Sequence, residues 1–202
     1  MHKFKIIGIT GATGSGKSTL TAYLVQKNFF VIDADKLAKQ IVQKNSVCLQ
    51  CITAVFGREI LYADGTLNRK ALARKAFSRK SETEKLNRIT HPFIIAETLQ
   101  IIDNIRQENT SSVMVLDAPL LFESKMDILC DYTVSVLCDK DIRLQRIMKR
   151  DNLSQNEALL RMNAQPDDVF YRSRSDFIID GSKPLSEIYA DADSIIRTIT
   201  ER

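Results

Sequence analysis

Residues 6–24, "IIGITGATGSGKSTLTAYL", combine four glycines, several hydroxyl residues and one lysine between an apolar run and a helix-like run. The segment matches G-x-x-x-x-G-K-[ST], the pattern of a phosphate-binding loop between a strand and a helix. Glycines let backbone N–H groups converge on phosphate oxygens, Lys17 supplies a charge near the β- and γ-phosphates, and the Ser18 hydroxyl is a ligand for Mg²⁺. We therefore predict a nucleotide-binding loop made of Gly11, Ala12, Thr13, Gly14, Ser15, Gly16, Lys17, Ser18 and Thr19.

Other nucleotide-binding classes fit this loop less well. A dinucleotide fold needs G-x-G-x-x-G, whereas the order here is G-x-x-G-x-G followed by Lys-Ser. The sequence contains neither the N-K-x-D nor the D-x-x-G motif expected of a GTPase, and 202 residues leave no room for the second domain of a nucleic-acid motor. A small-molecule kinase is the class that remains.

Two acids end apolar runs that have the character of strands, Asp33 in FFVID (29–33) and Asp117 in SVMVLD (112–117). The carboxyl ends of parallel strands meet at the sheet edge that carries the phosphate loop. We expect Asp33 to orient or deprotonate the acceptor hydroxyl and Asp117 to hold Mg²⁺ through water. Either acid could instead cap the following helix, and Asp35 fits a cap or a partner of the helix dipole.

Arginines gather in the segment 139–165, which has the pattern of two helices. Arg143, Arg146 and Arg150 are spaced three and four apart and share a helix face, and Arg161 follows on the second helix. Such a hairpin has the form of a lid over a triphosphate, whose arginines would offset developing charge and help exclude water. We expect at least one of Arg143, Arg146 and Arg161 to contact phosphate; the alternative is a solvated charged face.

Strands alternate with helices along most of the chain. The predicted strands are 3–9, 29–33, 112–117, 131–137 and 176–180. This alternation predicts an α/β fold with a parallel sheet covered on both faces, and the helical stretch between residues 34 and 108 is long enough to form its own lobe. Pro92 fits the first turn of a helix in that stretch, with His91 as a possible cap.

Composition excludes several functional classes. With 44% hydrophobic and 27% charged residues the chain is typical of a globular protein, and no apolar run reaches the roughly 18 residues of a membrane span. The net charge of +4 is spread along the chain, which does not favour nucleic acid as a partner. We expect a cytoplasmic protein, and a helix face rather than a metal or redox site at Cys48 and Cys51.

With these residues in place, the chain resembles the dephospho-coenzyme A kinase family along nearly its whole length. The resemblance rests on GITGATGSGKST (8–19), DAD (33–35), LNRKALARKAF (67–77), HP (91–92), DAPLLFE (117–123), RLQRIMKRD (143–151), R-x-x-x-Q (161–165) and SDFIID (175–180). Many families share the phosphate loop, whereas HP and PLLFE after an acid-ended strand are far more specific.

The resemblance implies transfer of the γ-phosphoryl group of ATP to the ribose 3′-hydroxyl of dephospho-CoA with Mg²⁺, the last step of coenzyme A biosynthesis. It implies a five-stranded parallel P-loop kinase core (1–33, 110–138 and 166–202), a helical CoA-binding insertion (34–109) and a helical lid (139–165). The expected partners are the small molecules ATP and dephospho-CoA, and the expected assembly is a monomer or a small homo-oligomer.

The site residues fall into four groups. The catalytic group is Asp33, Lys17, Arg143 and Arg146, and Arg146 and Arg161 join the loop in binding ATP. The acceptor group is Thr10, Asp33, Leu67, Arg69, His91, Leu121 and Glu123. The metal group is Ser18 and Asp117.

The chain departs from the family pattern at two places. Ala12-Thr13 replace a usual Gly-Ile pair, and Gly181 replaces the usual Asn after IID, so an adenine contact from that side chain is lost or passes to backbone. Two alternatives stay open, another P-loop kinase for a nucleoside or a sugar, and a nucleotide-binding protein without turnover.

Overall fold

The computed structural model describes residues 4–108 and 113–201. By their internal contacts, residues 1–32 and 109–202 form one compact unit and residues 33–108 form a second. Within the described ranges, no helix is both long and apolar enough to cross a membrane.

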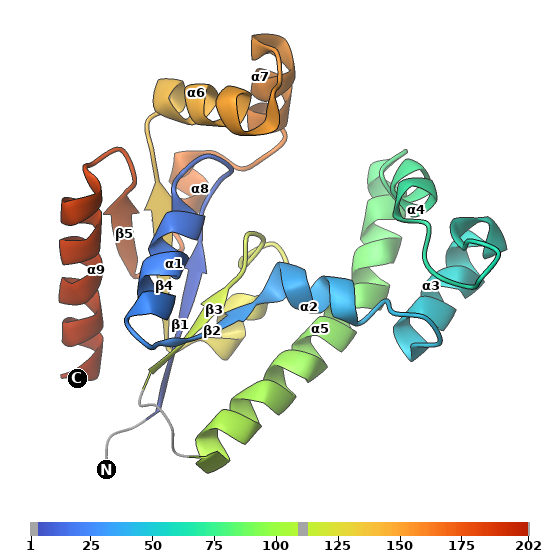
Figure 1. Cartoon of the computed structure of the whole chain (residues 1–202), viewed down its shortest axis with the longest axis horizontal. Coiled ribbons are helices and arrows are strands. Elements are labelled where there is room, and N and C mark those ends of the chain that lie inside the picture. The colour runs from blue at the N-terminus through green and yellow to red at the C-terminus, as the bar shows by residue number, and fades with distance from the viewer. Residues whose placement is uncertain (1–3, 109–112, 202) are drawn as a thin grey trace. The chain divides into compact units, whose positions relative to one another are not determined.

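A five-stranded parallel sheet organises the first unit (Figure 1). Its strands are β1 (Lys5–Thr10), β2 (Phe30–Asp33), β3 (Val113–Asp117), β4 (Tyr132–Leu137) and β5 (Phe177–Asp180), in the order β2-β3-β1-β4-β5. The predicted sheet is confirmed, with each strand beginning one or two residues later than its apolar run. Lys3 and Ser112 of the predicted strands lie outside the described residues.

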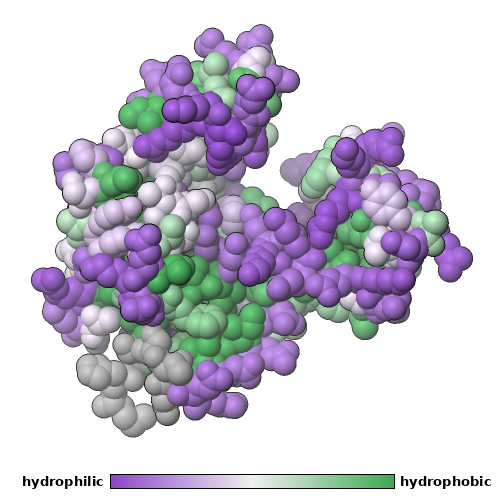
Figure 2. Space-filling model, in the orientation of Figure 1, coloured by the Kyte–Doolittle hydropathy of each residue, from purple (hydrophilic) through white to green (hydrophobic). Residues whose placement is uncertain are grey.

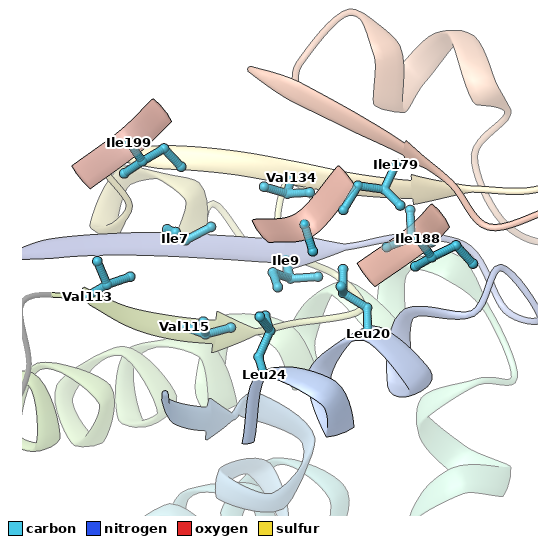
Figure 3. Close-up of a cluster of buried hydrophobic side chains, with 12 residues drawn as sticks. Ile7, Ile9, Leu20, Leu24, Val113, Val115, Val134, Ile179, Ile188 and Ile199 are labelled. Carbon is cyan, nitrogen blue, oxygen red and sulfur yellow. The ribbon is translucent and has the colours of Figure 1, made fainter. Parts of the chain in front are cut away.

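One face of the sheet is covered by α1 (Lys17–Gln26) and α9 (Leu185–Thr200). Figure 3 shows the side chains that meet there, among them Ile9 of β1, Leu20 of α1 and Ile188 of α9. All three are almost completely buried. Because burying one such aliphatic side chain is worth about 1.5–3 kcal/mol, this layer holds α1, and with it the phosphate loop, firmly on the sheet.

The opposite face carries the short helix α8 (Asp168–Arg172). Successive residues of a strand point to opposite faces. Ile179 of β5 therefore joins the α1–α9 layer, while its neighbour Ile178 packs with Leu137 and Tyr171 on the other side. The sheet is covered on both faces, as parallel sheets require. The 3-10 helix η2 (Met126–Leu129) lies near β1.

The segment predicted as two helices forms α6 (Lys140–Asp151) and α7 (Gln155–Asn163). Asn152 ends α6 in the left-handed conformation, and Ser154 and Glu157 form the predicted capping box at the start of α7. Leu153 packs against the small apolar cluster that joins the two helices. Figure 2 shows mainly hydrophilic residues on the visible surface over α6 and α7.

The second unit is built from helices. These are α2 (Ala34–Gln40), α3 (Val47–Phe56), the 3-10 helix η1 (Arg58–Ile60), α4 (Arg69–Ala76) and α5 (Lys80–Glu108). Their core includes Ile52 and Ile60, both fully buried. Cys48 is buried on the same face of α3 and Cys51 is exposed, and burial raises the pKa of the Cys48 thiol to about 11. A neutral, buried thiol suits the predicted helix face.

The expected helix start at Pro92 is wrong, and the alternative that His91 caps a helix is excluded. Both residues lie inside α5, which spans 29 residues. A proline in a helix interior removes one backbone hydrogen bond and favours a bend over a straight course, and Figure 1 shows α5 changing direction along its length. Ile89 and Phe93, on either side, pack against the core of this unit, and these contacts keep the helix continuous across the proline.

Candidate active site

The glycine loop between β1 and α1 has the backbone geometry of an anion-binding turn. Gly14 and Gly16 take positive φ angles of 79° and 102°, a region that side chains disfavour. Gly16 stands at the N-cap of α1, and no side chain of the described residues caps this helix end. The N–H groups of Lys17 and Ser18 and the positive end of the helix dipole are therefore available to an anion, whereas the N–H of Thr19 donates to the carbonyl of Gly16.

Lys17 and Asp117 form an ion pair beside this turn. The ammonium group of Lys17 donates to Oδ1 of Asp117, and only 13% and 12% of the two side chains are exposed. Asp117 ends β3 directly opposite Ile9 of β1, one residue before that strand ends. The sheet register thus places a carboxylate next to the loop, as the pattern of acid-ended strands predicted.

Three arginines of α6 donate hydrogen bonds to the loop, two to backbone carbonyl groups and one to a hydroxyl group. Nε of Arg143 donates to the carbonyl oxygen of Thr13 at 3.1 Å, and Nη1 of Arg146 donates to that of Gly14 at 3.3 Å. Nη2 of Arg150 donates to the hydroxyl of Thr13 at 3.3 Å. Since Arg143 is only 5% exposed, the structure ties it to the loop; phosphate contacts by Arg143 and Arg146 stay predictions.

Arg161 has a different partner. Its Nη1 donates to Oδ2 of Asp151, the last residue of α6, at 2.6 Å. About half of the Arg161 side chain is exposed, so it can still turn toward a ligand. Its expected phosphate contact also stays a prediction.

Two residues around the loop, Gln165 and Cys138, were not assigned a role from sequence. The side-chain oxygen of Gln165 accepts the backbone N–H of Thr13 at 2.8 Å, and Nη1 of Arg146 lies 3.4 Å from Sγ of Cys138. The spacing R-x-x-x-Q pointed to Gln165 without showing what it binds. No sequence pattern indicated Cys138, because its contact depends on how β4 and α6 pack.

Gly181 is required by a close approach between two backbones. A Cβ atom at this position would lie 1.9 Å from the carbonyl oxygen of Ser15, inside the loop. Its own carbonyl accepts Nη2 of Arg146 at 3.0 Å, and its N–H donates to the carbonyl of Leu137. A side chain at this position would displace the phosphate loop, which accounts for glycine here.

Replacing Gly181 with alanine should therefore damage both stability and nucleotide binding. We expect the added methyl group to cost about 1–3 kcal/mol, as overpacking does, and to weaken ATP binding because Ser15 must move. Thermal unfolding and calorimetric ATP titration measure the two effects. Ser182→Ala adds no atoms but removes the acceptor of the Asp139 N–H, so it shows how much a change at the next residue costs without the clash. A Gly181→Ala protein with the stability and ATP affinity of the native chain would contradict this account.

Three of the expected acceptor residues lie in the first unit. Thr10 is fully buried and donates its hydroxyl to the carbonyl of Pro119 at 3.1 Å, and Leu121 is fully buried as well. Because neither side chain reaches the surface, these two residues could support the wall of an acceptor site but not contact the acceptor directly. Glu123 is exposed, yet the protein packed around its carboxyl group raises its pKa, while Arg174 acts in the opposite direction.

The remaining acceptor residues lie in the second unit, which begins at Asp33, the last residue of β2. Asp33 caps α2 by accepting the N–H of Lys36 at 2.9 Å, and Arg69 donates to the carbonyl of Lys39 at 3.2 Å. Leu67 is half-buried in a short pairing with Leu61, and burial lowers the pKa of His91 within α5. The cap that sequence analysis offered as an alternative for Asp33 is thus present, and its second carboxylate oxygen, Oδ2, is the one we assign to catalysis below.

The parallel sheet and the loop that ends in Lys17 and Ser18 define a P-loop kinase. The family model for dephospho-CoA kinase matches residues 5–187. A dephospho-CoA kinase of Fusobacterium nucleatum is 36% identical over 194 residues, covering 96% of this chain and 98% of the relative. The chain belongs to the dephospho-CoA kinase family, and it is a kinase of coenzyme A biosynthesis.

Two solved structures are similar to this chain along nearly its whole length. A protein from Thermus thermophilus superposes with a TM-score of 0.83 at 29% identity, covering 98% of this chain and 99% of that one. A dephospho-CoA kinase from Campylobacter jejuni superposes with a TM-score of 0.71 at 28% identity, covering 97% of both chains.

Proposed function

We propose that the chain transfers the γ-phosphoryl group of ATP to the ribose 3′-hydroxyl of dephospho-CoA, yielding coenzyme A and ADP. The observation that carries this proposal is the uncapped N-terminus of α1, with Lys17 and Asp117 paired beside it. It supplies backbone donors and one positive charge where a triphosphate needs them, and a carboxylate where a metal ion would lie.

On the donor side, the backbone of the loop and Lys17 would hold the β- and γ-phosphates. Lys17 would share its charge between Asp117 and the phosphate oxygens, because an ammonium group has three donors. Arg146 and Arg161 would add positive charge on the lid side, and Arg143 would keep Thr13 in place. Their common effect is to stabilise the charge that spreads over the transferred group.

Ser18 and Asp117 fit the Mg²⁺ that this chemistry uses. A hydroxyl and a carboxylate are hard oxygen donors, and Mg²⁺ is commonly held by one or two protein oxygens together with substrate phosphates and water. The Ser18 side chain is exposed in the first turn of α1, and Asp117 lies beside Lys17 at the end of β3. The ion, when bound, would neutralise charge between the β- and γ-phosphates.

On the acceptor side, Asp33 would accept the proton of the 3′-hydroxyl. As that O–H bond breaks, the oxygen bonds to the γ-phosphorus, and the bond between this phosphorus and the β–γ bridging oxygen breaks to release ADP. The residues that we assign to acceptor binding are Leu67, Arg69, His91, Glu123, Thr10 and Leu121. The same proposal includes three further points. The chain is divided into a core, a CoA-binding insertion and a lid; it is located in the cytoplasm; and it is a monomer or a small homo-oligomer.

A coupled ADP-release assay tests this proposal. Dephospho-CoA, adenosine, a nucleoside monophosphate and gluconate are offered separately with ATP and Mg²⁺. We expect turnover with dephospho-CoA. Turnover with only one of the other three would support a different small-molecule kinase, and ATP binding without any turnover would support a non-catalytic protein.

A further inference from the structure

All three polar groups of Thr13 are bound by side chains from the segment that follows β4. Its N–H donates to Oε1 of Gln165 at 2.8 Å, its carbonyl accepts Nε of Arg143 at 3.1 Å, and its hydroxyl accepts Nη2 of Arg150 at 3.3 Å. Thr13 therefore attaches the phosphate loop to the lid segment rather than offering its N–H to a phosphate.

Only one of these three bonds depends on the side chain. The bonds to Gln165 and Arg143 use the backbone of residue 13, so any residue there could make them. The bond to Arg150 needs the hydroxyl. The particular contribution of threonine at this position is thus the contact with Arg150.

Arg150 is linked to Arg161 through Asp151, to which both arginines donate. Its Nε and Nη2 grip both oxygens of Asp151 at 2.8 Å each, a two-point arrangement that fixes the plane of both groups. Oδ2 of Asp151 also accepts Nη1 of Arg161 at 2.6 Å. The hydrogen bond from Arg150, followed by the charges of Arg150 and Arg161, keeps the pKa of Asp151 below its ordinary value, so it is ionised at neutral pH.

This relay, Thr13–Arg150–Asp151–Arg161, is better suited to orientation than to stability. Arg150 and Arg161 are 55% and 51% exposed, and ion pairs of that exposure contribute little to folding. What they do restrict is the freedom of two long side chains. A guanidinium group has five N–H donors, so Arg161 can keep Asp151 and also bind a phosphate oxygen.

We propose that Thr13 is a positioning residue, whose hydroxyl, through Arg150 and Asp151, fixes the guanidinium group of Arg161 relative to the phosphate loop before ATP binds. This inference rests on the proposed function, in which Arg161 contacts the triphosphate. Holding the side chain in advance lowers the entropy that ATP binding must overcome.

Thr13→Val tests the relay, because valine keeps the shape of threonine and both backbone bonds but lacks the hydroxyl. We expect KM for ATP to rise roughly two- to fivefold, as fits the loss of one exposed hydrogen bond to a charged group, with a small change in kcat. Thr13→Ser, which keeps the hydroxyl, should reverse most of the loss. The midpoint of thermal unfolding should move by less than about 2 °C in both variants.

A second variant checks the same relay from its other end. Asp151→Asn should also raise KM for ATP, and adding Thr13→Val to it should raise KM no further, because both changes break one chain of contacts. Asp141→Asn removes one negative charge from the first turn of α6, outside the relay, and is the control for net charge. Full additivity of Thr13→Val and Asp151→Asn would overturn the relay.

The outcome is separable from the proposed function. Failure of the native chain to phosphorylate dephospho-CoA would refute the function, whereas calorimetric titration with ATP still reports the relay through the affinity of each variant. A Thr13→Val protein with native KM and native ATP affinity, or a Thr13→Ser protein as impaired as Thr13→Val, would overturn the inference.

Discussion

Replacing Lys17 with methionine is expected to lower kcat/KM for ATP by about 10²–10³-fold, the usual loss when one preorganised charge is removed from a transition state. Methionine keeps the length and the apolar stem of lysine but has no ammonium group. Lys17 lies at the start of α1, where the backbone donors of the loop converge, and no other described residue of the loop carries a charge. The coupled assay, run over a range of ATP concentrations, measures the loss.

Lys17→Met also removes the ion-pair partner of Asp117, so an activity measurement alone cannot separate lost catalysis from lost stability. Removing one member of a largely buried ion pair costs about 3–5 kcal/mol, so part of any loss could reflect unfolding. The double variant Lys17→Met/Asp117→Asn removes that charge imbalance. We expect it to regain most of the unfolding free energy in denaturant titrations while its activity stays low. Native activity in a folded Lys17→Met protein would remove Lys17 from the donor site.

Strand ends and the phosphate loop were predictable because their signals are local. A buried parallel strand must be apolar along its length. The residues that bind ligands in such a sheet lie at the carboxyl ends of the strands, where the apolar run stops. The runs before Asp33 and Asp117 show both features, and both residues end strands in the structure. The capping box at Ser154 is equally local, since donor and acceptor are three residues apart.

The course of α5 could not be predicted from local signals. A proline most often begins or ends a helix, and the pair His91-Pro92 follows that rule when taken by itself. Whether the helix continues is decided by what its flanking turns bury. Ile89 and Phe93 pack on one apolar cluster of the second unit, and that packing outweighs the lost hydrogen bond. Tertiary packing thus overrode a local preference.

The contacts between the loop and α6 escaped prediction for a related reason. Sequence spacing places Arg143, Arg146 and Arg150 on one helix face, but it does not say which backbone that face meets. In the structure each of them donates to Thr13 or Gly14. The approach of Gly181 to Ser15 joins residues that are far apart in the chain, so it too follows only from the packing of the last strand against the loop.

Asp33 has two oxygens and, in our proposal, two roles. Oδ1 accepts the N–H of Lys36 and caps α2, and this bond fixes the carboxyl group at the end of β2. Oδ2 would take the proton of the acceptor hydroxyl. Alanine has no side-chain oxygen, so Asp33→Ala would remove the cap and the base together. Loss of the N-cap alone costs about 1 kcal/mol of stability, which would obscure the effect on catalysis. A useful variant must keep the cap and remove only the base.

Asp33→Asn separates these roles, since asparagine caps a helix about as well as aspartate but cannot accept a proton at neutral pH. We expect kcat to fall by about 10²–10⁴-fold, the typical contribution of a general base, with KM for ATP and the unfolding free energy nearly unchanged. Asp35→Asn, two residues further in the first turn of α2, removes the same charge and is the matched control. Native kcat in Asp33→Asn would exclude Asp33 as the base. An equal loss in Asp35→Asn would instead assign the effect to the negative charge at this helix end, because only a specific proton acceptor distinguishes the two positions.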